Sequence, residues 1–468
     1  MDILEPVSEA ILHTLTHARR EISPDDLQQF TKAFEAEPRN QIALNAVTKT
    51  PLTQVAMNRR TVVRTNHTYS HMVKAGASTT QNKSGRCWMF AGLNLFRMAA
   101  AEKLGMEDFE LSQNYLFLWD KLEKSNYFLE SVLETLEEDT DSRLIAWLMQ
   151  SPIQDGGQWD MFVNLVKKYG VVPKEAMPET ESSSASHVMN DRITNKLREY
   201  AARLRRSHRE GIGTEALRSQ KSDMLAEVYR MLCIHLGEPP TDFLWQWRDK
   251  DKNFHRDGLL TPQQFREKYV DIDLDNMVCL IHCPQNETPY NKLFTVNYLG
   301  NVVGGHGVRY LNVEMDVLKQ ASVAMIKDGK PVWFGCDVGK MFDRDLGLMD
   351  TELYDFEGVY GVPFHMTKAE RLDYGASLMT HAMVFTGVDL DDDPEHLDKP
   401  RKWRVENSWG DKNGDKGFML MTDAWFDQFN YEVVVEKKYV APELLAILET
   451  DPIGLPPWHP MGSLAGAV

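Results

Sequence analysis

Residues 81–93 read Gln-Asn-Lys-Ser-Gly-Arg-Cys-Trp-Met-Phe-Ala-Gly-Leu. The first six residues are small or polar and predict a turn, and the run that begins at Cys87 is typical of a helix. Amides at a helix N-terminus carry partial positive charge, which stabilises a thiolate. Cys87 is therefore a candidate nucleophile, and the side chain of Gln81 is a candidate donor to an oxyanion formed beside it.

Two later segments add the partners that such a nucleophile needs. His381 stands at the start of an apolar run, and Asn407 lies in Glu-Asn-Ser-Trp-Gly at 406–410. An imidazole takes the proton of the thiol, and an amide oxygen that accepts from the second ring nitrogen fixes the ring's orientation and tautomer. A lone cysteine or histidine is more often part of a core. All three residues in this order match the papain-type pattern.

The spacing departs from that pattern. The distance from Cys87 to His381 along the chain is about twice the roughly 130–150 residues usual between these positions. The excess predicts an insertion, and the charged region 190–300 is where we expect it.

Helical spacing dominates the first part of the chain, and short β-type runs follow residue 320. The expected helices cover 1–45, 87–104, a segment from 112, and 161–169, while 46–80 reads as irregular. The expected strands are 332–334, 382–388, 402–405, 417–421 and 431–435. Helices followed by strands predict an α+β protein in which a helical lobe faces a barrel-like sheet lobe, with a large, mainly helical insertion.

We expect residues 1–468 to form a single catalytic unit with approximate sub-regions. These are an N-terminal arm (1–80), a helical lobe with the nucleophile (81–189), the insertion (190–300), a β-rich lobe with His381 and Asn407 (301–450), and a C-terminal tail (451–468).

Composition excludes several classes of protein. No stretch of about 18 apolar residues is present, so we expect no membrane span, and the N-terminal pattern is unlike an export signal. Five cysteines are too few for a disulfide framework. Cys279 and Cys283 flank Leu-Ile-His without a second ligand pair, so we expect no metal and no cofactor. Together these features favour the cytoplasm.

Charge bears on nucleic-acid binding. The formal net charge is −17, which opposes nonspecific binding to nucleic acid. The segment 192–209 is nevertheless rich in arginine, with Glu199 and Glu210 interleaved or adjacent. We interpret it as a solvated or subunit-facing helix rather than a nucleic-acid surface.

The chain resembles the bleomycin hydrolases, the cytoplasmic aminopeptidase branch of the papain-like cysteine proteases, from about residue 50 onward. The motifs that carry the resemblance are Ser84–Trp88, Asp155–Met161, Arg248–Asn253, Val332–Lys340, Leu378–Met383, Trp403–Gly410 and Trp458–Gly462. The resemblance implies that Cys87 is the nucleophile, His381 the acid and base, Asn407 the orienting residue and Gln81 the oxyanion donor. It also implies a papain-like fold, peptide substrates, a backbone-binding strip at Gly156 and Gly157, and a homohexameric ring with contacts from 190–300.

The resemblance further implies that the C-terminal tail lies in the active-site cleft. Its terminal carboxylate would pair with the free α-amine of a substrate and so measure distance from the chain end. Family tails commonly stop at or just past the position of Ala465, which makes Ala465 a candidate substrate-binding residue. We therefore expect the enzyme to trim Gly466-Ala467-Val468 itself.

Three other functions are open to the sequence. One is a nucleic-acid-binding ring with a secondary peptidase, which depends on the 192–209 segment. A catalytically inactive scaffold is disfavoured because all four site residues are present. Thiol-transferase or transglutaminase chemistry shares a Cys-His pair but does not explain the Cys-Trp helix start together with Asn-Ser-Trp-Gly.

Overall fold

The computed structural model describes residues 21–393 and 398–465, apart from the side chain of Ala465. The described residues form two compact units. One comprises those of Met1–Val62 with Tyr354–His365, and the other those of Val63–Leu353 with Met366–Val468. All of the described candidate site residues belong to the second, larger unit.

The smaller unit is helical. Its helices are α2 (Pro24–Ala36), α3 (Pro38–Val47), α4 (Leu52–Ala56) and α15 (Phe356–Tyr360), and α5 (Arg59–Arg64) crosses its boundary. Ser23 caps α2 in a capping box with Asp26, and Pro24 occupies the first turn. The predicted helicity of 1–45 is confirmed where the chain is described; residues 1–20 lie outside that part.

The prediction that 46–80 is irregular is wrong in part. This stretch contains α4, α5 and the short strand β1 (His71–Met72). These elements span two to six residues, too short for the 11–18-residue window in which helical or strand periodicity can be counted.

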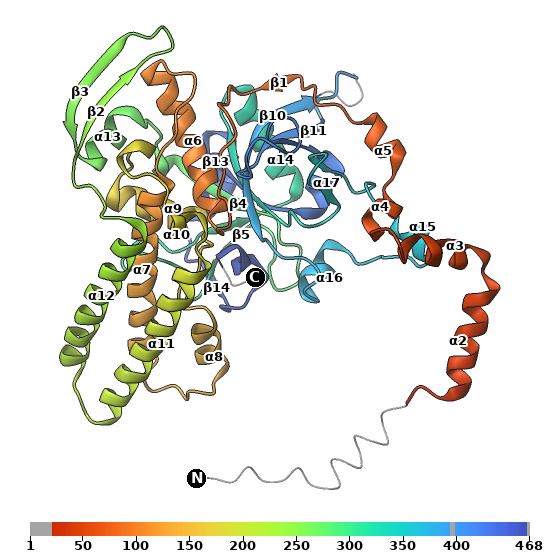
Figure 1. Ribbon diagram of the computed structural model, residues 1–468, viewed down its shortest axis with the longest axis horizontal. Coiled ribbons are helices and arrows are strands. Elements are labelled where there is room, and N and C mark those ends of the chain that lie inside the picture. The colour runs from red at the N-terminus through yellow and green to blue at the C-terminus, as the bar shows by residue number, and fades with distance from the viewer. Residues whose placement is uncertain (1–20, 394–397, 466–468) are drawn as a thin grey trace. The chain divides into compact units, whose positions relative to one another are not determined.

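The larger unit begins with a helical layer (Figure 1). The described helices of the larger unit are α6 (Cys87–Leu104), α7 (Gln113–Glu134), α8 (Arg143–Gln150), α9 (Trp159–Tyr169), α10 (Glu181–Ser184), α11 (His187–Arg209), α12 (Thr214–Leu236), α13 (Pro262–Tyr269), α14 (Met315–Lys327), α16 (Lys368–Asp373), α17 (Asp423–Phe429) and α18 (Pro442–Leu445). The predicted helices from Cys87, from near Ser112 and through Tyr169 are confirmed.

Helix α6 is the central element of this layer. It is apolar on most sides, and its residues from Cys87 to Arg97 are all buried, as expected of a helix segment with neighbours all round. Gly105 ends it in the left-handed region at φ 64°, where its N–H bonds to the carbonyls of Ala101 and Glu102. In Figure 1 α6 lies between the other long helices and the sheet, and it contacts α7 and α9 as well as β7 and β10.

A 12-stranded sheet forms the second layer. Its order is β14-β5-β6-β4-β13-β7-β10-β11-β12-β9-β8, with β1 paired to β10. The strands are β4 (Met277–Ile281), β5 (Lys292–Val296), β6 (Tyr310–Asn312), β7 (Val332–Cys336), β8 (Phe342–Asp343), β9 (Leu348–Met349), β10 (His381–Leu390), β11 (Pro400–Glu406), β12 (Phe418–Thr422), β13 (Asn430–Glu436) and β14 (Ile453–Leu455); β2 (Phe243–Arg248) and β3 (Phe254–Leu260) form a separate hairpin.

All five predicted strands are present, but the expectation that strands begin only after residue 320 is wrong. β4, β5 and β6 precede that point and pair into the same sheet. Each is three to five residues long and largely buried, so no alternation of polar and apolar residues marks it in the sequence. The α+β class itself is confirmed.

Both faces of the sheet are covered. Along β10, Ala382 and Val384 pack into the core shared with the helical layer, while Met383 and Phe385 pack into a second core with α14 and α17. This follows from the two-residue alternation of a strand. No described helix is long and apolar enough to cross a membrane.

Candidate active site

Cys87 is the first residue of α6, as the sequence predicts. Its side chain is buried, and burial raises the pKa of the thiol to about 11. Hydrogen bonds from the backbone of Ala382, Trp88 and Cys87 itself lower that pKa in opposition. The contact with Ala382 is informative because it brings the sulfur to the residue that follows His381.

His381 and Asn407 meet because of strand order. His381 is the first residue of β10, and Asn407 follows the last residue of β11. These strands are antiparallel neighbours, so the start of one and the end of the other share one edge. The ring Nε2 of His381 lies 3.0 Å from the Oδ1 of Asn407. The predicted histidine–amide pair is therefore present.

The pair is enclosed. His381 and Asn407 are both buried, and burial lowers the pKa of His381 to about 4 although the bond to Asn407 raises it. The ring of Trp409 lies 5.0 Å from that of His381, centre to centre. Burial thus disfavours charge on the thiol or on the imidazole alone. A thiolate beside an imidazolium compensates both charges, so the two groups are expected to ionise as a pair.

Gln81 is held by the segment that carries Asn407 and by its own turn. Its backbone N–H donates to the carbonyl of Ser408 at 2.8 Å, and its Oε1 accepts from the hydroxyl of Ser408 at 2.6 Å. Its Nε2 donates to the carbonyl of Ser84. These bonds distinguish the nitrogen of the Gln81 amide from its oxygen. The nitrogen carries two N–H groups, and the bond to Ser84 uses one of them.

Gly156 and Gly157 lie against the start of α6. A Cβ on Gly157 would stand 2.5 Å from the indole of Trp88, so only glycine fits there. The carbonyl of Gly156 accepts from the ammonium of Lys124, and the carbonyl of Asp155 accepts from the Trp88 indole N–H at 2.7 Å. The backbone of this strip is held close to Cys87.

The carboxylate of Asp155 joins several segments of the site, and the sequence did not indicate these contacts. It accepts from the N–H of Gly85 at 2.9 Å, from Ser186 and from Asn190, and it pairs with the ammonium of Lys121 at 2.7 Å. The Lys121 ammonium and these donors hold the pKa of Asp155 well below its usual range although burial opposes them. Asp155 therefore ties the cysteine turn to α7 and α11.

The C-terminal segment lies beside the same site. The carbonyl of Met461 accepts from the hydroxyl of Tyr310 at 3.1 Å, and the hydroxyl of Ser463 donates to the carbonyl of Met379 at 2.8 Å. Leu464 is buried. The short helix Pro460–Ala465 thus contacts Met379, two residues before His381 and the start of β10. The side chain of Ala465 and residues 466–468 lie outside the described part, so the predicted trimming and the role of Ala465 stay predictions.

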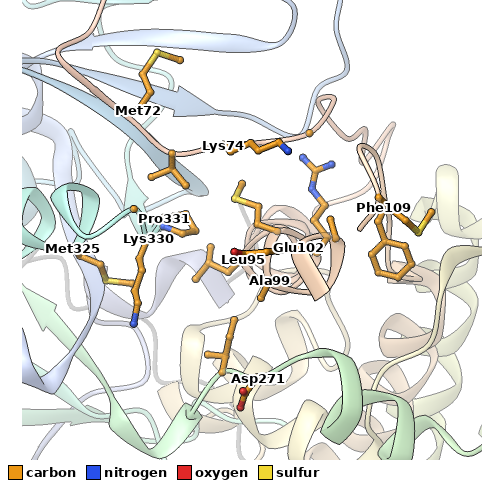
Figure 2. Close-up of a pocket in the computed structure, with 18 of the residues that line it drawn as sticks. Met72, Lys74, Leu95, Ala99, Glu102, Phe109, Asp271, Met325, Lys330 and Pro331 are labelled. Atoms are coloured by element: carbon orange, nitrogen blue, oxygen red, sulfur yellow. The ribbon is translucent and has the colours of Figure 1, made fainter. Parts of the chain in front are cut away.

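A large cavity lies away from these residues. A cavity of about 870 Å³ borders the C-terminal half of α6, and Met98, Glu102 and Gly105 contribute to its wall. Figure 2 shows Leu95 and Ala99 facing it, with Lys330 and Asp271 on other segments of its wall. Its lining does not include Cys87, His381 or Asn407. Among the described residues, no group of three or more His, Cys, Asp or Glu side chains is placed to hold a metal ion.

Comparison with known proteins agrees with this geometry. A model of the Peptidase C1-like family matches residues 21–462. The chain belongs to the Peptidase C1-like family. An aminopeptidase C of Listeria innocua is 47% identical over 445 residues, which cover 95% of this chain and 99% of that protein. The human bleomycin hydrolase is 45% identical over 451 residues, with the same coverage.

A solved relative extends the match to the fold. The crystal structure of PepW from Lactobacillus rhamnosis HN001 superposes with a TM-score of 0.92 at 48% identity, covering 94% of this chain and 99% of that chain. The papain-like fold predicted from the Cys-Trp turn and the later His and Asn segments is confirmed.

Several contacts of the site were missed from the sequence. Ser408, Asp155 and the buried pair of Arg86 with Glu179 all hold the predicted residues in place. Ser408 sits within the quoted Asn-Ser-Trp-Gly segment, and Arg86 and Asp155 adjoin Cys87 and Gly156. Their position next to site residues was a signal, but their partners come from distant segments that only the fold brings close.

Proposed function

We propose that this chain is a cysteine aminopeptidase of the bleomycin hydrolase type. It removes N-terminal residues from peptides and hydrolyses amide-bearing analogues such as bleomycin. The observation that carries the proposal is the contact between Cys87, buried at a helix start, and the backbone of Ala382, which follows His381 of the buried His381–Asn407 pair. The membership of the Peptidase C1-like family and the names of the relatives support it.

In the proposed reaction the thiolate of Cys87 attacks the carbonyl carbon of the scissile amide. The oxyanion that forms accepts from the N–H of Cys87 and from the free N–H of the Gln81 amide. His381 then gives its proton to the departing amine, and a thioester remains on Cys87. Water, deprotonated by His381, hydrolyses that thioester and regenerates the thiol. Asn407 holds the imidazole in position during both steps.

The preference for free N-termini is proposed from the C-terminal segment. This segment is fastened to Met379 on one wall of the site and lies near Gln158, which follows Gly157, on the other. In this proposal it blocks the space that the residues preceding the scissile bond of a longer substrate would need. Substrates therefore enter with few residues before that bond, and the α-amine would meet the end of the segment.

The test is a panel of fluorogenic aminoacyl amides, each with a free and with a blocked α-amine. We expect turnover of the free compounds and at most weak turnover of the blocked ones. Efficient cleavage of the blocked compounds would refute the aminopeptidase assignment while leaving a cysteine peptidase. Loss of all activity after alkylation of Cys87 identifies the nucleophile in the same assay.

We also infer a homohexamer in the cytoplasm. The helix α2 has no buried residues, and its Leu27 and Phe30 are 55% and 60% exposed. Apolar side chains that are this exposed support an assembly in which other subunits cover them. Light scattering during gel filtration is expected to give the mass of six chains, and a monomer would contradict the inference.

Nucleic-acid binding is the less favoured alternative. The guanidinium of Arg198 donates to the carbonyls of Met149 and Gln150, and that of Arg205 donates to the carbonyls of Thr135 and Glu138. These side chains have partners within the protein, which leaves less of the basic segment for phosphates. A gel shift is expected to show no complex at physiological salt.

A further inference from the structure

The residue directly before the nucleophile is a fully buried arginine. Arg86 is the N-cap of α6 and is 0% exposed. Burying a guanidinium is costly unless all of it is paired. We propose that Arg86, held by Glu179, is a positioning residue of the active site: the pair fixes the loop that carries Cys87 and Gln81, and its charge balance sets how readily Cys87 ionises. This inference rests on the proposed role of Cys87.

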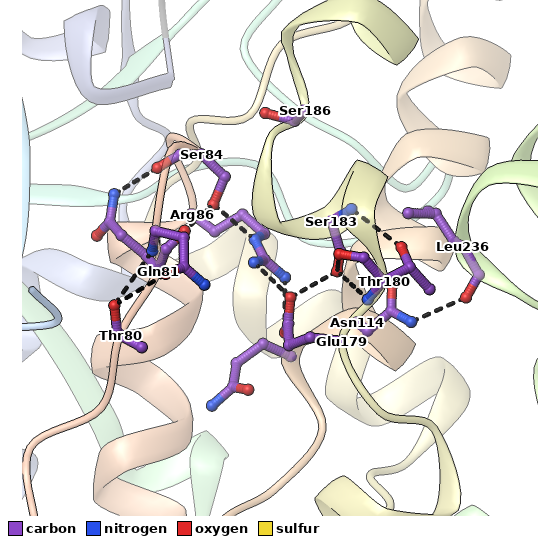
Figure 3. Close-up of polar contacts among 12 residues, drawn as sticks. Thr80, Gln81, Ser84, Arg86, Asn114, Glu179, Thr180, Ser183, Ser186 and Leu236 are labelled. Atoms are coloured by element: carbon purple, nitrogen blue, oxygen red, sulfur yellow. Dashed lines mark hydrogen bonds and ion pairs between the residues drawn. The ribbon is translucent and has the colours of Figure 1, made fainter. Parts of the chain in front are cut away.

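Each of the three guanidinium nitrogens donates a hydrogen bond (Figure 3). Its Nη1 and Nη2 donate to the two carboxylate oxygens of Glu179 at 3.0 and 2.8 Å, a bidentate pair. Its Nε donates to the hydroxyl of Ser84 at 2.8 Å. The rings of Phe90 and Phe117 lie 5.1 and 4.9 Å from its central carbon. A lysine cannot reproduce this planar set of contacts.

From Arg86 the contacts continue to the proposed oxyanion donor. The hydroxyl of Ser84, which accepts from Arg86, donates to the carbonyl of Gln81 at 2.7 Å, and the Gln81 amide donates back to the carbonyl of Ser84. Gln81 in turn accepts from Ser408, whose N–H donates to the Oδ1 of Asn407 at 2.8 Å. One hydrogen-bonded chain thus joins Arg86 to the residue that orients His381.

Glu179 itself is fixed by its surroundings. It also accepts from the hydroxyl of Ser183 at 2.6 Å, within a capping box that Thr180 and Ser183 form at the start of α10. The side chain of Asn114 donates to the carbonyls of Pro178 and Leu236 and anchors the preceding residue to α7 and α12 (Figure 3). Glu179 is therefore a firm support rather than a mobile counter-ion.

Variants that change the charge of the Arg86–Glu179 pair distinguish a positioning role from a purely stabilising one. Glu179→Gln leaves an uncompensated guanidinium on the residue that precedes Cys87, which favours the thiolate. Arg86→Gln leaves the carboxylate uncompensated and favours the thiol. The double variant restores neutrality without the geometry. The other titratable groups around the thiol stay unchanged in all variants; they are His381 on β10, Cys336 on β7, Asp155, and Lys121 and Lys124 on α7.

The experiment measures two quantities in parallel. The first is the pH dependence of alkylation of Cys87 by iodoacetamide, followed by the mass of the peptide that contains it, which reports ionisation of the thiol without any substrate. The second is kcat and KM for a free aminoacyl amide, scaled to the amount of alkylatable Cys87. The variants are Glu179→Gln, Arg86→Gln, their combination, Arg86→Lys and Ser84→Ala. Glu181→Gln, an exposed neighbour on α10, is the matched control.

We expect the pH midpoint of alkylation to fall by about one unit in Glu179→Gln, to rise in Arg86→Gln, and to return in the double variant. Arg86→Lys and Ser84→Ala keep the charge, so their midpoint stays while kcat falls about tenfold with little change in KM. Glu181→Gln changes neither quantity.

An unchanged midpoint in Glu179→Gln, together with wild-type kcat in Arg86→Lys and Ser84→Ala, would overturn the inference and leave Arg86 a purely structural residue. If Glu179→Gln does not fold, Arg86→Lys and Ser84→Ala decide the positioning claim, and Arg86→Gln decides the charge claim. Midpoints that shift as expected in a protein without peptidase activity would support the inference and refute the proposed function, so the two failures are distinguishable.

Discussion

The two ends of α6 are built in contrasting ways. At its N-terminus the chain is enclosed, and the turn that carries Cys87 is hydrogen-bonded to several distant segments. At its C-terminus Gly105 closes the helix beside a cavity of about 870 Å³, where methionine side chains and exposed charges line the wall. The side chains at the N-terminal end are held in place, whereas those at the C-terminal end have room to move. Substitutions at the first end should therefore disturb the reaction far more than those at the second.

The largest effect is expected for Cys87→Ala. Removing the sulfur removes the nucleophile, so the turnover of a free aminoacyl amide should fall by about 10⁴-fold or more. The side chain is small, and the variant should unfold at nearly the wild-type temperature. Turnover near the wild-type rate would exclude Cys87 as the nucleophile, and the two ends of α6 would then differ in packing alone.

Asp155→Ala tests the carboxylate that joins the segments around the N-terminus of α6. It leaves the buried ammonium of Lys121 without its carboxylate, which should cost about 3–5 kcal/mol in the free energy of unfolding measured with urea. The matched control is Asp271→Ala, which removes the exposed partner of Lys103 at the other end and should cost at most about 1 kcal/mol. Equal losses in the two variants would break the contrast.

The low pKa of Asp155 also predicts how the free energy of unfolding changes at acid pH. The pKa of Asp155 is lower in the folded protein than in the unfolded chain, where it is about 3.9. Its contribution to stability is therefore complete above that unfolded value and is lost as the pH falls towards the folded value. Urea titrations between pH 5 and pH 3 should show the wild type losing more stability than Asp155→Ala.

Gln81→Ala addresses the oxyanion. Loss of one such donor typically lowers kcat by about 10²–10³-fold. KM should change little, because the donor acts on charge that develops only in the transition state. A large rise in KM with an unchanged kcat would assign Gln81 to ground-state binding instead.

The smallest effect is expected for Met98→Leu, in the wall of the cavity at the C-terminal end. The exchange conserves volume and should cost less than about 1.5 kcal/mol. Turnover should stay at the wild-type level. A marked loss of activity would show that the cavity communicates with Cys87 along α6, and the two ends would no longer be independent.

The sequence predicted the fold class and brought together Cys87, His381 and Asn407 because each lies in a local pattern with a chemical reason. A helix start, a strand start and a glycine-rich turn can all be seen in a few neighbouring residues. The strands β4 to β6 were missed because they are short and buried on both faces. Asp155 and Glu179 were missed as partners because their contacts join segments far apart in the chain, and no local pattern encodes which distant side chain will arrive.

The hydrogen bonds that Ser186 and Asn190 donate to Asp155, and that Arg86 donates to Glu179, have a practical consequence for protein engineering. The region that begins near Glu179 cannot be trimmed away to obtain a minimal enzyme, since its first turns are scaffolding for the reactive sulfur. A graft of the Cys87 loop into a smaller host would need to bring α10 and the beginning of α11 with it.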